Sequence, residues 1–279
     1  MVIIKKTELL ISFLENQRKL KEKIGFVPTM GALHEGHLSL IQHSIKDCNL
    51  TVCSIFVNPT QFNNIEDFQT YPITIEKDIE LLENAGCDVL FLPEKDEIYP
   101  VGFQKTHYTI GKIEQVLEGT HRPGHFQGVC MVVDQLLSII NCDHLYLGQK
   151  DYQQCLVIKK LIELKSIQTH LIVVDTVREP NGLAMSSRNK RLDDFQLKKS
   201  SVLFKSLTYA AQHIGQYPLS EVIEKAIAMI VHEGFAIDYF AICDKELEPI
   251  STFDINSSIV ILVAASINGV RLIDNIVIS

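Results

Sequence analysis

The segment Phe26-Val-Pro-Thr-Met-Gly-Ala-Leu-His-Glu-Gly-His37 carries the strongest structural signal in this chain. The apolar run from Ile24 to Val27 predicts a short strand, and Pro28 is expected to end its pairing because proline lacks a backbone N–H. From Leu38 onward, apolar residues recur at helical spacing. The stretch is therefore predicted to be a strand, a tight turn and the first turn of a helix.

A junction of this kind can bind phosphate groups. The unpaired N–H groups and the positive end of the helix dipole point outward from it. His34 and His37 are three residues apart, so they are expected on one side of the first helical turn, where they can donate hydrogen bonds to phosphate oxygens. The alternative is a surface turn that carries two solvated histidines.

The segments that follow predict a doubly wound α/β sheet. Leu50–Val57 is a nearly continuous apolar run, as in a parallel strand that is covered on both faces. Helices and strands then alternate, which is typical of βαβ units. The helices are expected at 7–20, capped by Thr7, at 74–85, ended by Gly86, at 128–140 and at 150–165, and the strands at 88–92, 143–147 and 169–175. The fold class is thus α/β, with a Rossmann-like parallel sheet.

The last hundred residues indicate a second, smaller domain. A polar, glycine-containing linker at 178–191 is followed by two amphipathic helices, near Asp193–His213 and Leu219–Glu233, and by three strand-like runs at 237–243, 258–265 and 270–278. Helices followed by strands favour an α+β arrangement. We expect residues 1–178 to form a Rossmann-like domain and residues 179–279 a smaller C-terminal lid domain.

Composition narrows the class of function. The net charge of −8 argues against a nucleic-acid partner, because such proteins usually present a basic face. The seven cysteines include no C-x-x-C pair, which indicates reduced core thiols. The longest apolar run, Ile259–Ile267, is too short to span a bilayer, and the N-terminus has no signal-peptide pattern. A cytoplasmic protein without a membrane partner is expected.

Four polar strings follow predicted strands, and their convergence is the main argument for a site. They are Met30–His37, Asn58–Phe62, Gly148–Gln154 and Val177–Arg188. In open parallel sheets, ligands bind beyond the carboxyl ends of the strands. Each string alone also fits a solvated turn or an ordinary polar linker.

The residue types in these strings suit a nucleotide and a small polar acid. Lys150 can hold phosphate oxygens, and Asp151 can accept hydrogen bonds from ribose or cap the following helix. The amide of Gln61 can both donate and accept, which suits a substrate with a hydroxyl and a carboxylate. Gln154 lies one turn beyond Lys150, on the same side; an exposed helix residue is the alternative.

The string Met185-Ser-Ser-Arg188 can wrap a triphosphate and stabilise charge on the leaving pyrophosphate. No spacing of His, Cys and Asp resembles a structural zinc site, and a magnesium ion held mainly by phosphates fits better. Asp78 is the candidate carboxylate for that ion, with a solvated helix aspartate as the alternative.

His34-Glu-Gly-His37 resembles the HxGH signature of the nucleotidyltransferase superfamily, which includes the class I aminoacyl-tRNA synthetases, and Met185–Arg188 resembles its KMSKS-type loop. Over residues 27–275 the chain resembles one family, the pantothenate synthetases (pantoate–β-alanine ligases). The matching strings are 26–37, 54–62, 71–72, 97–100, 117–119, 122–126, 148–154, 182–189 and 271–275. The chain departs from the family pattern at three positions. Ile73 stands where many relatives carry Arg, Gln149 replaces the more usual Glu, and Lys77 stands where some relatives carry a second acid.

The resemblance implies a two-step ligation through pantoyl adenylate, with Mg²⁺, in a homodimer. It implies catalytic roles for His37, His34, Lys150, Ser186, Ser187 and Arg188. ATP would contact Met30, Gly31, Ala32, Leu33, His34, Glu35, Gly36, His37, Gly148, Gln149, Lys150, Asp151, Val177, Met185, Ser186, Ser187 and Arg188. Pantoate would contact Gln61 and Gln154, and β-alanine would contact Gln61. Asp78 is kept as the candidate metal ligand from its residue type, because Lys77 stands where some relatives carry a second acid.

Two alternative functions remain. Another HxGH enzyme, such as an adenylyltransferase or a tRNA-synthetase relative, would share the ATP motifs; the acidic charge and the lack of an anticodon-binding extension argue against the latter. A non-catalytic ATP-binding regulator could have kept the fold, but His34, His37, Lys150 and Arg188 are all present.

Overall fold

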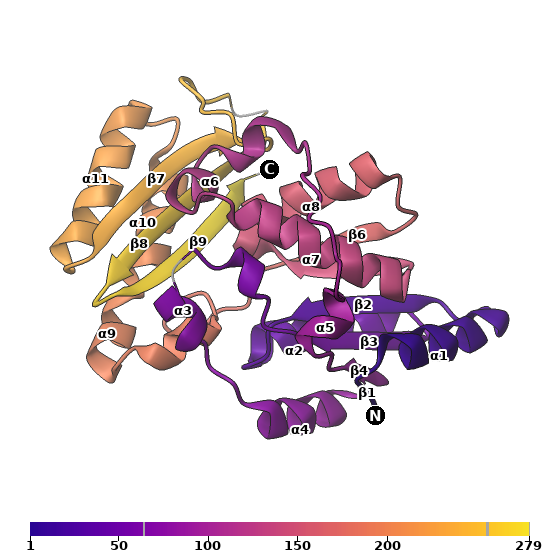
Figure 1. The fold of residues 1–279 in the computed structure, drawn as a ribbon. Helices are drawn as coiled ribbons and strands as arrows, with labels where there is room; N and C mark the ends of the chain where they lie inside the picture. Colours follow the sequence, from indigo (N-terminus) through magenta and orange to yellow (C-terminus); the bar gives the residue numbers. More distant parts are fainter. Residues whose placement is uncertain (64, 255–256, 279) are drawn as a thin grey trace. The chain divides into compact units, whose positions relative to one another are not determined.

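The computed structural model describes residues 1–63, 65–254 and 257–278. The chain forms two compact units (Figure 1). The first contains residues 1–148 and 154–175, and the second contains residues 149–153 and 176–279. The short segment 149–153 thus clusters with the C-terminal part of the chain, although it lies between elements of the first unit in sequence.

The first unit is built on a six-stranded parallel sheet in the order β1-β4-β3-β2-β5-β6. The strands are β1 (Val2–Ile4), β2 (Ile24–Thr29), β3 (Leu50–Ile55), β4 (Val89–Phe91), β5 (His144–Gly148) and β6 (His170–Val174). From β2 the chain moves outward through β3 and β4, and it then returns to place β5 on the other side of β2. This reversal is the topological switch point at which such sheets bind ligands, and it confirms the predicted doubly wound fold.

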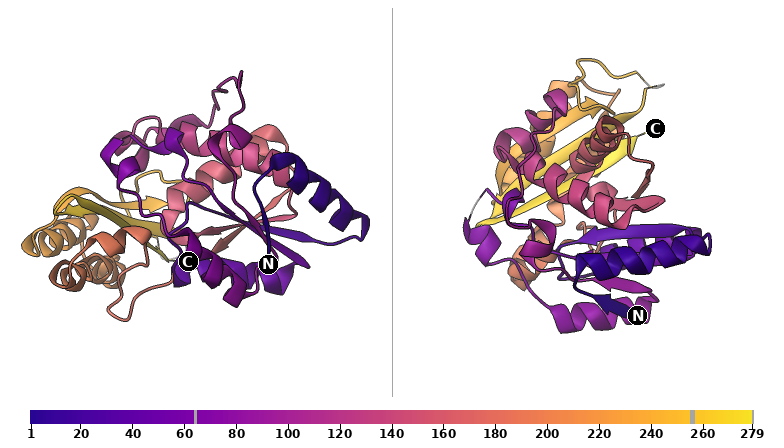
Figure 2. Two further views of the ribbon diagram at one scale, coloured as in Figure 1. Left: turned by 60° about the horizontal axis from the view of Figure 1, so that its bottom comes forward. Right: turned by 45° about the vertical axis from the view of Figure 1, so that its right-hand side comes forward.

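Helices cover both faces of this sheet (Figure 2). On one face lie α1 (Thr7–Lys19), α7 (His125–Ile140) and α8 (Tyr152–Lys165), and on the other lie α2 (Glu35–Asp47) and α4 (Ile75–Ala85). Phe26 and Val52 point into the first of these cores, and their neighbours Val27 and Cys53 point into the second. Because both faces are buried, the central strands read as continuous apolar runs.

Only short elements lie between β4 and α7. They are α5 (Lys95–Ile98), η2 (Gly111–Glu114) and α6 (Glu118–His121); η1 (Pro59–Gln61) and α3 (Ile65–Gln69) precede α4.

Pro28 does not end the pairing of β2, contrary to the prediction. The ladder to β3 continues through Pro28 and Thr29, and the carbonyl of Thr29 accepts from the N–H of Phe56 at 3.0 Å. Since successive residues of a strand bond to opposite sides, Pro28 faces the β5 side. There the pairing of β2 covers only Gly25 and Phe26, so the missing N–H of Pro28 costs no ladder bond.

The N-terminal region also differs from its prediction. Strand β1 was not foreseen, because it has only three residues and two of them are exposed. Thr7 is the first residue of α1 and Lys6 is its N-cap. The N–H of Thr7 donates instead to Oε2 of Glu97 at 2.8 Å. A side chain 90 residues away therefore replaces the local cap.

The second unit has a three-stranded antiparallel sheet, β7 (Ala236–Asp244), β8 (Ile259–Ile267) and β9 (Val270–Ile278), with β8 in the centre. Its helices are α9 (Asp194–Lys199), α10 (Val202–His213) and α11 (Leu219–His232), and its 3₁₀ turns are η3 (Gln149–Asp151) and η4 (Ser187–Arg191). Leu203 and Leu207 of α10, Ile230 of α11, and Ile261 and Val263 of β8 belong to one buried apolar cluster.

The helix expected over Asp193–His213 is divided between α9 and α10 at Ser200 and Ser201. The hydroxyl of Ser200 donates to the carbonyl of Gln196 at 2.8 Å, and that of Ser201 donates to the carbonyl of Lys198 at 2.9 Å. Serine hydroxyls that bond to nearby carbonyls compete with the helical backbone pattern. The apolar periodicity runs across the break, which is why the sequence did not reveal it.

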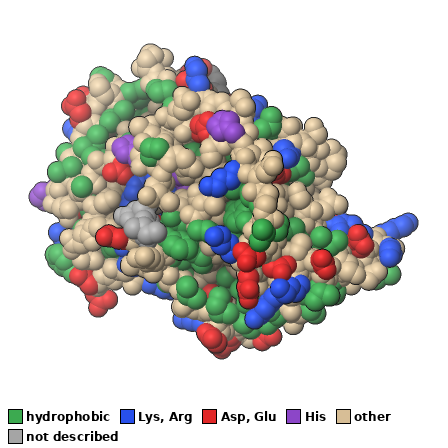
Figure 3. Space-filling model, viewed as in Figure 1, with side chains coloured by type: hydrophobic (Ala, Val, Ile, Leu, Met, Phe, Trp, Pro, Cys, Tyr) green, Lys and Arg blue, Asp and Glu red, His purple; other side chains and the backbone are tan. Residues whose placement is uncertain are grey.

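On the face shown in Figure 3, Lys and Arg side chains are interspersed with Asp and Glu. Within the described residues, no helix has the length and apolar character needed to cross a membrane.

Candidate functional site

The turn between β2 and α2 is fixed from the side by a buried carboxylate. Gly31 and Ala32 have positive φ angles of 81° and 52°. Oδ2 of Asp78, in α4, accepts from the N–H of Ala32 at 2.8 Å, and Oδ1 accepts from the N–H of Leu33 at 2.8 Å and from Oγ1 of Thr74 at 3.0 Å. The left-handed backbone at Ala32 is thus held by direct hydrogen bonds to its loop.

Asp78 is 1% exposed, so the solvated-aspartate alternative is wrong. Its two oxygens already accept three hydrogen bonds. This donor set fits a carboxylate that holds the Gly31–Leu33 loop better than one that binds a hydrated magnesium ion. Across the described parts of the chain, no group of three or more His, Cys, Asp or Glu side chains is arranged to hold a metal.

The two histidines lie side by side at the start of α2, as their spacing predicts. His34 is the N-cap of this helix, and its Nδ1 accepts from the N–H of Gly36 at 3.2 Å. A neutral His34 ring therefore carries its proton on Nε2. The ring of His37 follows with a centroid distance of 4.0 Å. The pair places two imidazoles at the N-terminus of a 13-residue helix, where the dipole favours an anion.

Asn58 organises the turn that follows β3. It is 1% exposed, and its Oδ1 accepts from the N–H of Thr60 at 3.3 Å and from the hydroxyl of Tyr99 at 3.0 Å. Its Nδ2 donates to the carbonyl of Gly128 in α7 and to Oε1 of Gln61, both at 3.1 Å. Tyr99 lies in the 97–100 string that resembles the family, but nothing in its local sequence predicted this contact with Asn58.

Gln61 is brought to the turn after β2. Its Nε2 lies 3.1 Å from Sδ of Met30, and its backbone carbonyl lies 2.8 Å from Nδ1 of His125. The first unit therefore joins the Asn58–Gln61 turn to the first residue of the Met30–His37 string. Gln154, the other predicted acid-binding glutamine, lies half-buried near the start of α8 in the same unit.

A close backbone approach fixes this turn against α7. A Cβ atom added to Gly128 would lie 2.3 Å from the carbonyl oxygen of Thr60 and 2.8 Å from Cα of Gln61. Only glycine lets the helix come this near.

Gly148 ends β5 in the first unit. The remaining predicted site residues lie in the second unit, in two segments. Gln149, Lys150 and Asp151 form η3, in which Nζ of Lys150 lies 3.0 Å from Oδ2 of Asp151. Val177 and Met185 face each other across a narrow loop, because the N–H of Met185 donates to the carbonyl of Val177 at 3.0 Å.

The segment after Met185 is ordered by its own hydrogen bonds. Oγ of Ser186 accepts from the N–H of Arg188 at 3.3 Å and caps η4. Ser187 is buried, and Nδ2 of the buried Asn189 donates to the carbonyl of Ala184 at 3.1 Å. This stretch is therefore a specific turn, which the linker alternative did not predict.

Comparison with known proteins points to one family. A family model described as pantoate-beta-alanine ligase matches residues 2–277. The chain is 41% identical over 278 residues to a pantothenate synthetase of Aquifex aeolicus, covering 98% of each chain. It is 41% identical over 268 residues to a pantothenate synthetase of Acinetobacter baumannii, covering 96% of this chain and 94% of the relative.

Solved structures give the same result. A pantothenate synthetase from Thermus thermophilus matches with a TM-score of 0.92 and 37% identity over 99% of each chain. A pantoate-beta-alanine ligase from Francisella tularensis, complexed with beta-gamma ATP and beta-alanine, matches with a TM-score of 0.83 and 38% identity, over 99% of this chain and 97% of that one.

Proposed function

The chain belongs to the pantoate-beta-alanine ligase family, and on that premise we propose that it joins pantoate to β-alanine at the expense of ATP. In the first step the pantoate carboxylate attacks the α-phosphorus of ATP, which forms pantoyl adenylate and releases pyrophosphate. In the second step the amine of β-alanine attacks the acyl carbon, which forms pantothenate and releases AMP.

The chemistry needs positioning and charge stabilisation rather than a protein nucleophile. A carboxylate is a poor acyl donor, and its conversion to a mixed anhydride with AMP supplies a good leaving group. Holding the acid beside the nucleotide converts a bimolecular encounter into an intramolecular one. Donors aimed at the phosphates stabilise the charge that develops on the leaving pyrophosphate.

The observation that carries the proposal is the contact between Gln61 and Met30, 3.1 Å from Nε2 to Sδ. It supports an arrangement in which an amide suited to pantoate and β-alanine lies beside the segment proposed to bind ATP. Gln154 is the second proposed pantoate ligand. His34, His37, Lys150, Ser186, Ser187 and Arg188 are the proposed catalytic donors to the phosphates.

Mg²⁺ belongs to the proposal as an ion that binds the ATP phosphates and supplies positive charge there. The hydrogen bonds of Asp78 favour an indirect role for this residue, through the shape of the Gly31–Leu33 loop. Residues 1–178 are proposed to bind ATP and pantoate, and residues 179–279 to act as the lid domain.

The test is pyrophosphate release from ATP and pantoate in the presence of Mg²⁺, with and without β-alanine. We expect about one equivalent per site without the amine, since the adenylate stays bound, and continuous release of AMP and pantothenate with it. A protein that binds ATP but releases no pyrophosphate when pantoate is added would contradict the proposal. That result would favour another acid substrate or a non-catalytic regulator.

A cytoplasmic homodimer is a further part of the proposal, taken from the resemblance to the family. Light scattering coupled to gel filtration measures the assembly, and a mass twice the 31.5 kDa of one chain is expected.

A further inference from the structure

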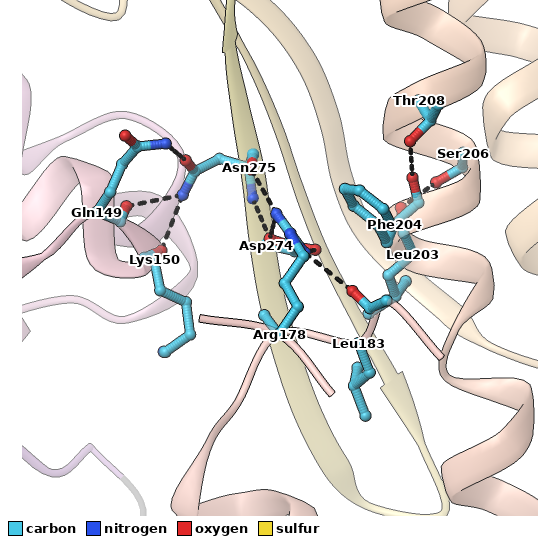
Figure 4. A network of polar contacts seen from close by, with 12 residues as sticks. Gln149, Lys150, Arg178, Leu183, Leu203, Phe204, Ser206, Thr208, Asp274 and Asn275 are labelled. Atoms are coloured by element: carbon cyan, nitrogen blue, oxygen red, sulfur yellow. Dashed lines mark hydrogen bonds and ion pairs between the residues drawn. The ribbon is translucent and has the colours of Figure 1, made fainter. Parts of the chain in front are cut away.

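Two adjacent residues of β9, Asp274 and Asn275, bind two segments of the second unit that contain residues expected to contact ATP (Figure 4). Both are 2% exposed. The segments are Gln149–Asp151 and Val177–Met185, and neither is close to β9 in sequence.

Asn275 holds the first segment by its backbone. Its Nδ2 donates to the carbonyl oxygens of Gln149 and Lys150, both at 2.9 Å, across 126 and 125 residues of sequence. Its Oδ1 accepts from Nε2 of Gln149 at 3.3 Å. The side chain of Lys150 runs away from Asn275 in Figure 4, so the amide fixes the backbone of this residue without binding its ammonium group, which pairs with Asp151.

Asp274 holds the second segment through Arg178. The guanidinium donates two parallel hydrogen bonds to the carboxylate, from Nη1 to Oδ2 at 2.6 Å and from Nη2 to Oδ1 at 3.0 Å. Nη1 also donates to the carbonyl of Gly182 at 3.1 Å, and Nη2 donates to the carbonyl of Asn275 at 3.2 Å. Burial raises the pKa of Asp274 and Arg178 opposes this shift, as expected for a buried carboxylate that is paired with a cation.

The turn of this segment is packed as well as bonded. Arg178 stacks on Phe204, with its Cζ 3.9 Å from the ring centroid. Gly182 has a φ of 92°, and a Cβ there would lie 2.6 Å from Cδ1 of Phe204. The loop that leads from Val177 to Met185 is therefore held on one side by a bidentate ion pair and on the other by an aromatic ring.

We propose that Asp274 and Asn275 are positioning residues of the ATP site, which fasten Gln149–Lys150 and Val177–Met185 to one rigid strand. The inference rests on the proposed function for its ligand. In it, Asn275 acts on the Lys150 segment and Asp274 on the Met185 segment, so the two residues have separable effects.

The residue types follow from the geometry. Two carbonyl acceptors require a side chain with two N–H donors on one nitrogen, and aspartate or alanine at 275 leaves both carbonyls without them. An Arg178→Lys change keeps the charge opposite Asp274 but loses the planar fork that reaches both carboxylate oxygens and two carbonyls.

The experiment compares Asn275→Ala and Arg178→Lys with Arg271→Gln in the full-length enzyme. Arg271 lies in the same strand and pairs with Asp238 of β7 at 2.6 Å, so its replacement controls for the loss of an ion pair from β9. Hydrogen exchange is read separately for residues 149–153 and for the amide of Met185, and the KM values for ATP and pantoate are read from pyrophosphate release.

We expect Asn275→Ala to speed exchange at 149–153 and leave Met185 unchanged, and Arg178→Lys to do the reverse. Each should raise the KM for ATP about tenfold, the effect of one or two lost hydrogen bonds, with the KM for pantoate within about twofold of the wild type. Arg271→Gln should move neither KM.

Exchange and KM values equal to those of Arg271→Gln would overturn the proposal. If Asn275→Ala does not fold, Arg178→Lys still tests the role of Asp274 in holding Val177–Met185, because it keeps a positive charge opposite Asp274. Failure of the proposed function would be seen separately, because the wild type would then release no pyrophosphate. Hydrogen exchange would still report whether the two segments are held by Asp274 and Asn275.

Discussion

At the scale of the residue, His37 and Lys150 belong to different units, yet the proposed chemistry gives both the same task, donation to phosphate. We predict that His37→Ala and Lys150→Ala each lower the rate of pyrophosphate release by roughly 10²–10³, the effect of losing one donor to the transition state. Single-turnover kinetics with saturating ATP measure this. Rates near that of the wild type in both variants would remove the two residues from the chemistry.

Gln154 is predicted to act on the acid and not on the nucleotide. Its amide is half-buried in α8, and removal in Gln154→Ala should raise the KM for pantoate about tenfold or more, as expected when one or two hydrogen bonds to a charged group are lost. The KM for ATP should change little. Equal changes in both constants would show that the pantoate pocket lies elsewhere.

Asp78 is predicted to stabilise the turn after β2. In Asp78→Asn, an NH₂ group replaces one of the two oxygens that face the N–H groups of Ala32 and Leu33. The free energy of unfolding should fall by about 1–3 kcal/mol, the cost of a buried unsatisfied donor, and urea denaturation measures it. Lys77→Ala is the matched control, because Lys77 is the exposed neighbour in the same helix.

A direct metal role of Asp78 would give the opposite pattern. Asp78→Asn would then leave the urea midpoint unchanged and raise the Mg²⁺ concentration needed for half-maximal activity.

At the scale of the element, the contact between α7 and η1 decides where Gln61 lies. Gly128→Ala places a Cβ 2.3 Å from the carbonyl oxygen of Thr60, so the helix and the turn must separate. We predict a loss of about 1–3 kcal/mol of stability, typical of overpacking, and a raised KM for pantoate. Thermal unfolding and initial rates measure the two effects.

Ser138→Ala serves as the control for this helix. Its exposed hydroxyl bonds only to the carbonyl of Asp134 in the same helix among the contacts described, so both measurements should stay near the wild-type values. A Gly128→Ala protein that behaves like Ser138→Ala would show that the helix can yield without moving Gln61.

At the scale of the whole molecule, the seven cysteines are free thiols. Six are buried and Cys48 is partly exposed. Burial raises the pKa of Cys87, Cys130 and Cys142 to about 12, so at pH 8 only about 10⁻⁴ of each is thiolate. The cores of both units therefore protect their thiols as long as they stay folded.

We predict that a chromogenic disulfide reagent at pH 8 titrates at most one thiol rapidly in the native protein and seven in guanidinium chloride. Fast reaction of several thiols without denaturant would contradict the packing of the two cores. A total below seven after unfolding under non-reducing conditions would indicate disulfides.

Local patterns in the sequence were enough to predict the alternation of the longer helices and strands after β1, the fold class and the strings that resemble the family. These follow from local patterns: the continuous apolar run of β3, the helical spacing from Leu38, and the glycine after α4. The side-by-side placement of His34 and His37 also followed from spacing alone, because one helical turn sets it.

Which polar side chains bind distant backbone groups became clear only from the tertiary structure. Asp78 binds a loop 46 and 45 residues away, Glu97 replaces a cap 90 residues away, and Asn275 fixes carbonyls 126 and 125 residues away. A carboxylate or amide has the same local pattern whether it faces solvent, a ligand or a distant backbone group. Only the packing of the chain brings one partner within 3 Å and excludes the others, so the choice among these roles is absent from any local stretch of sequence.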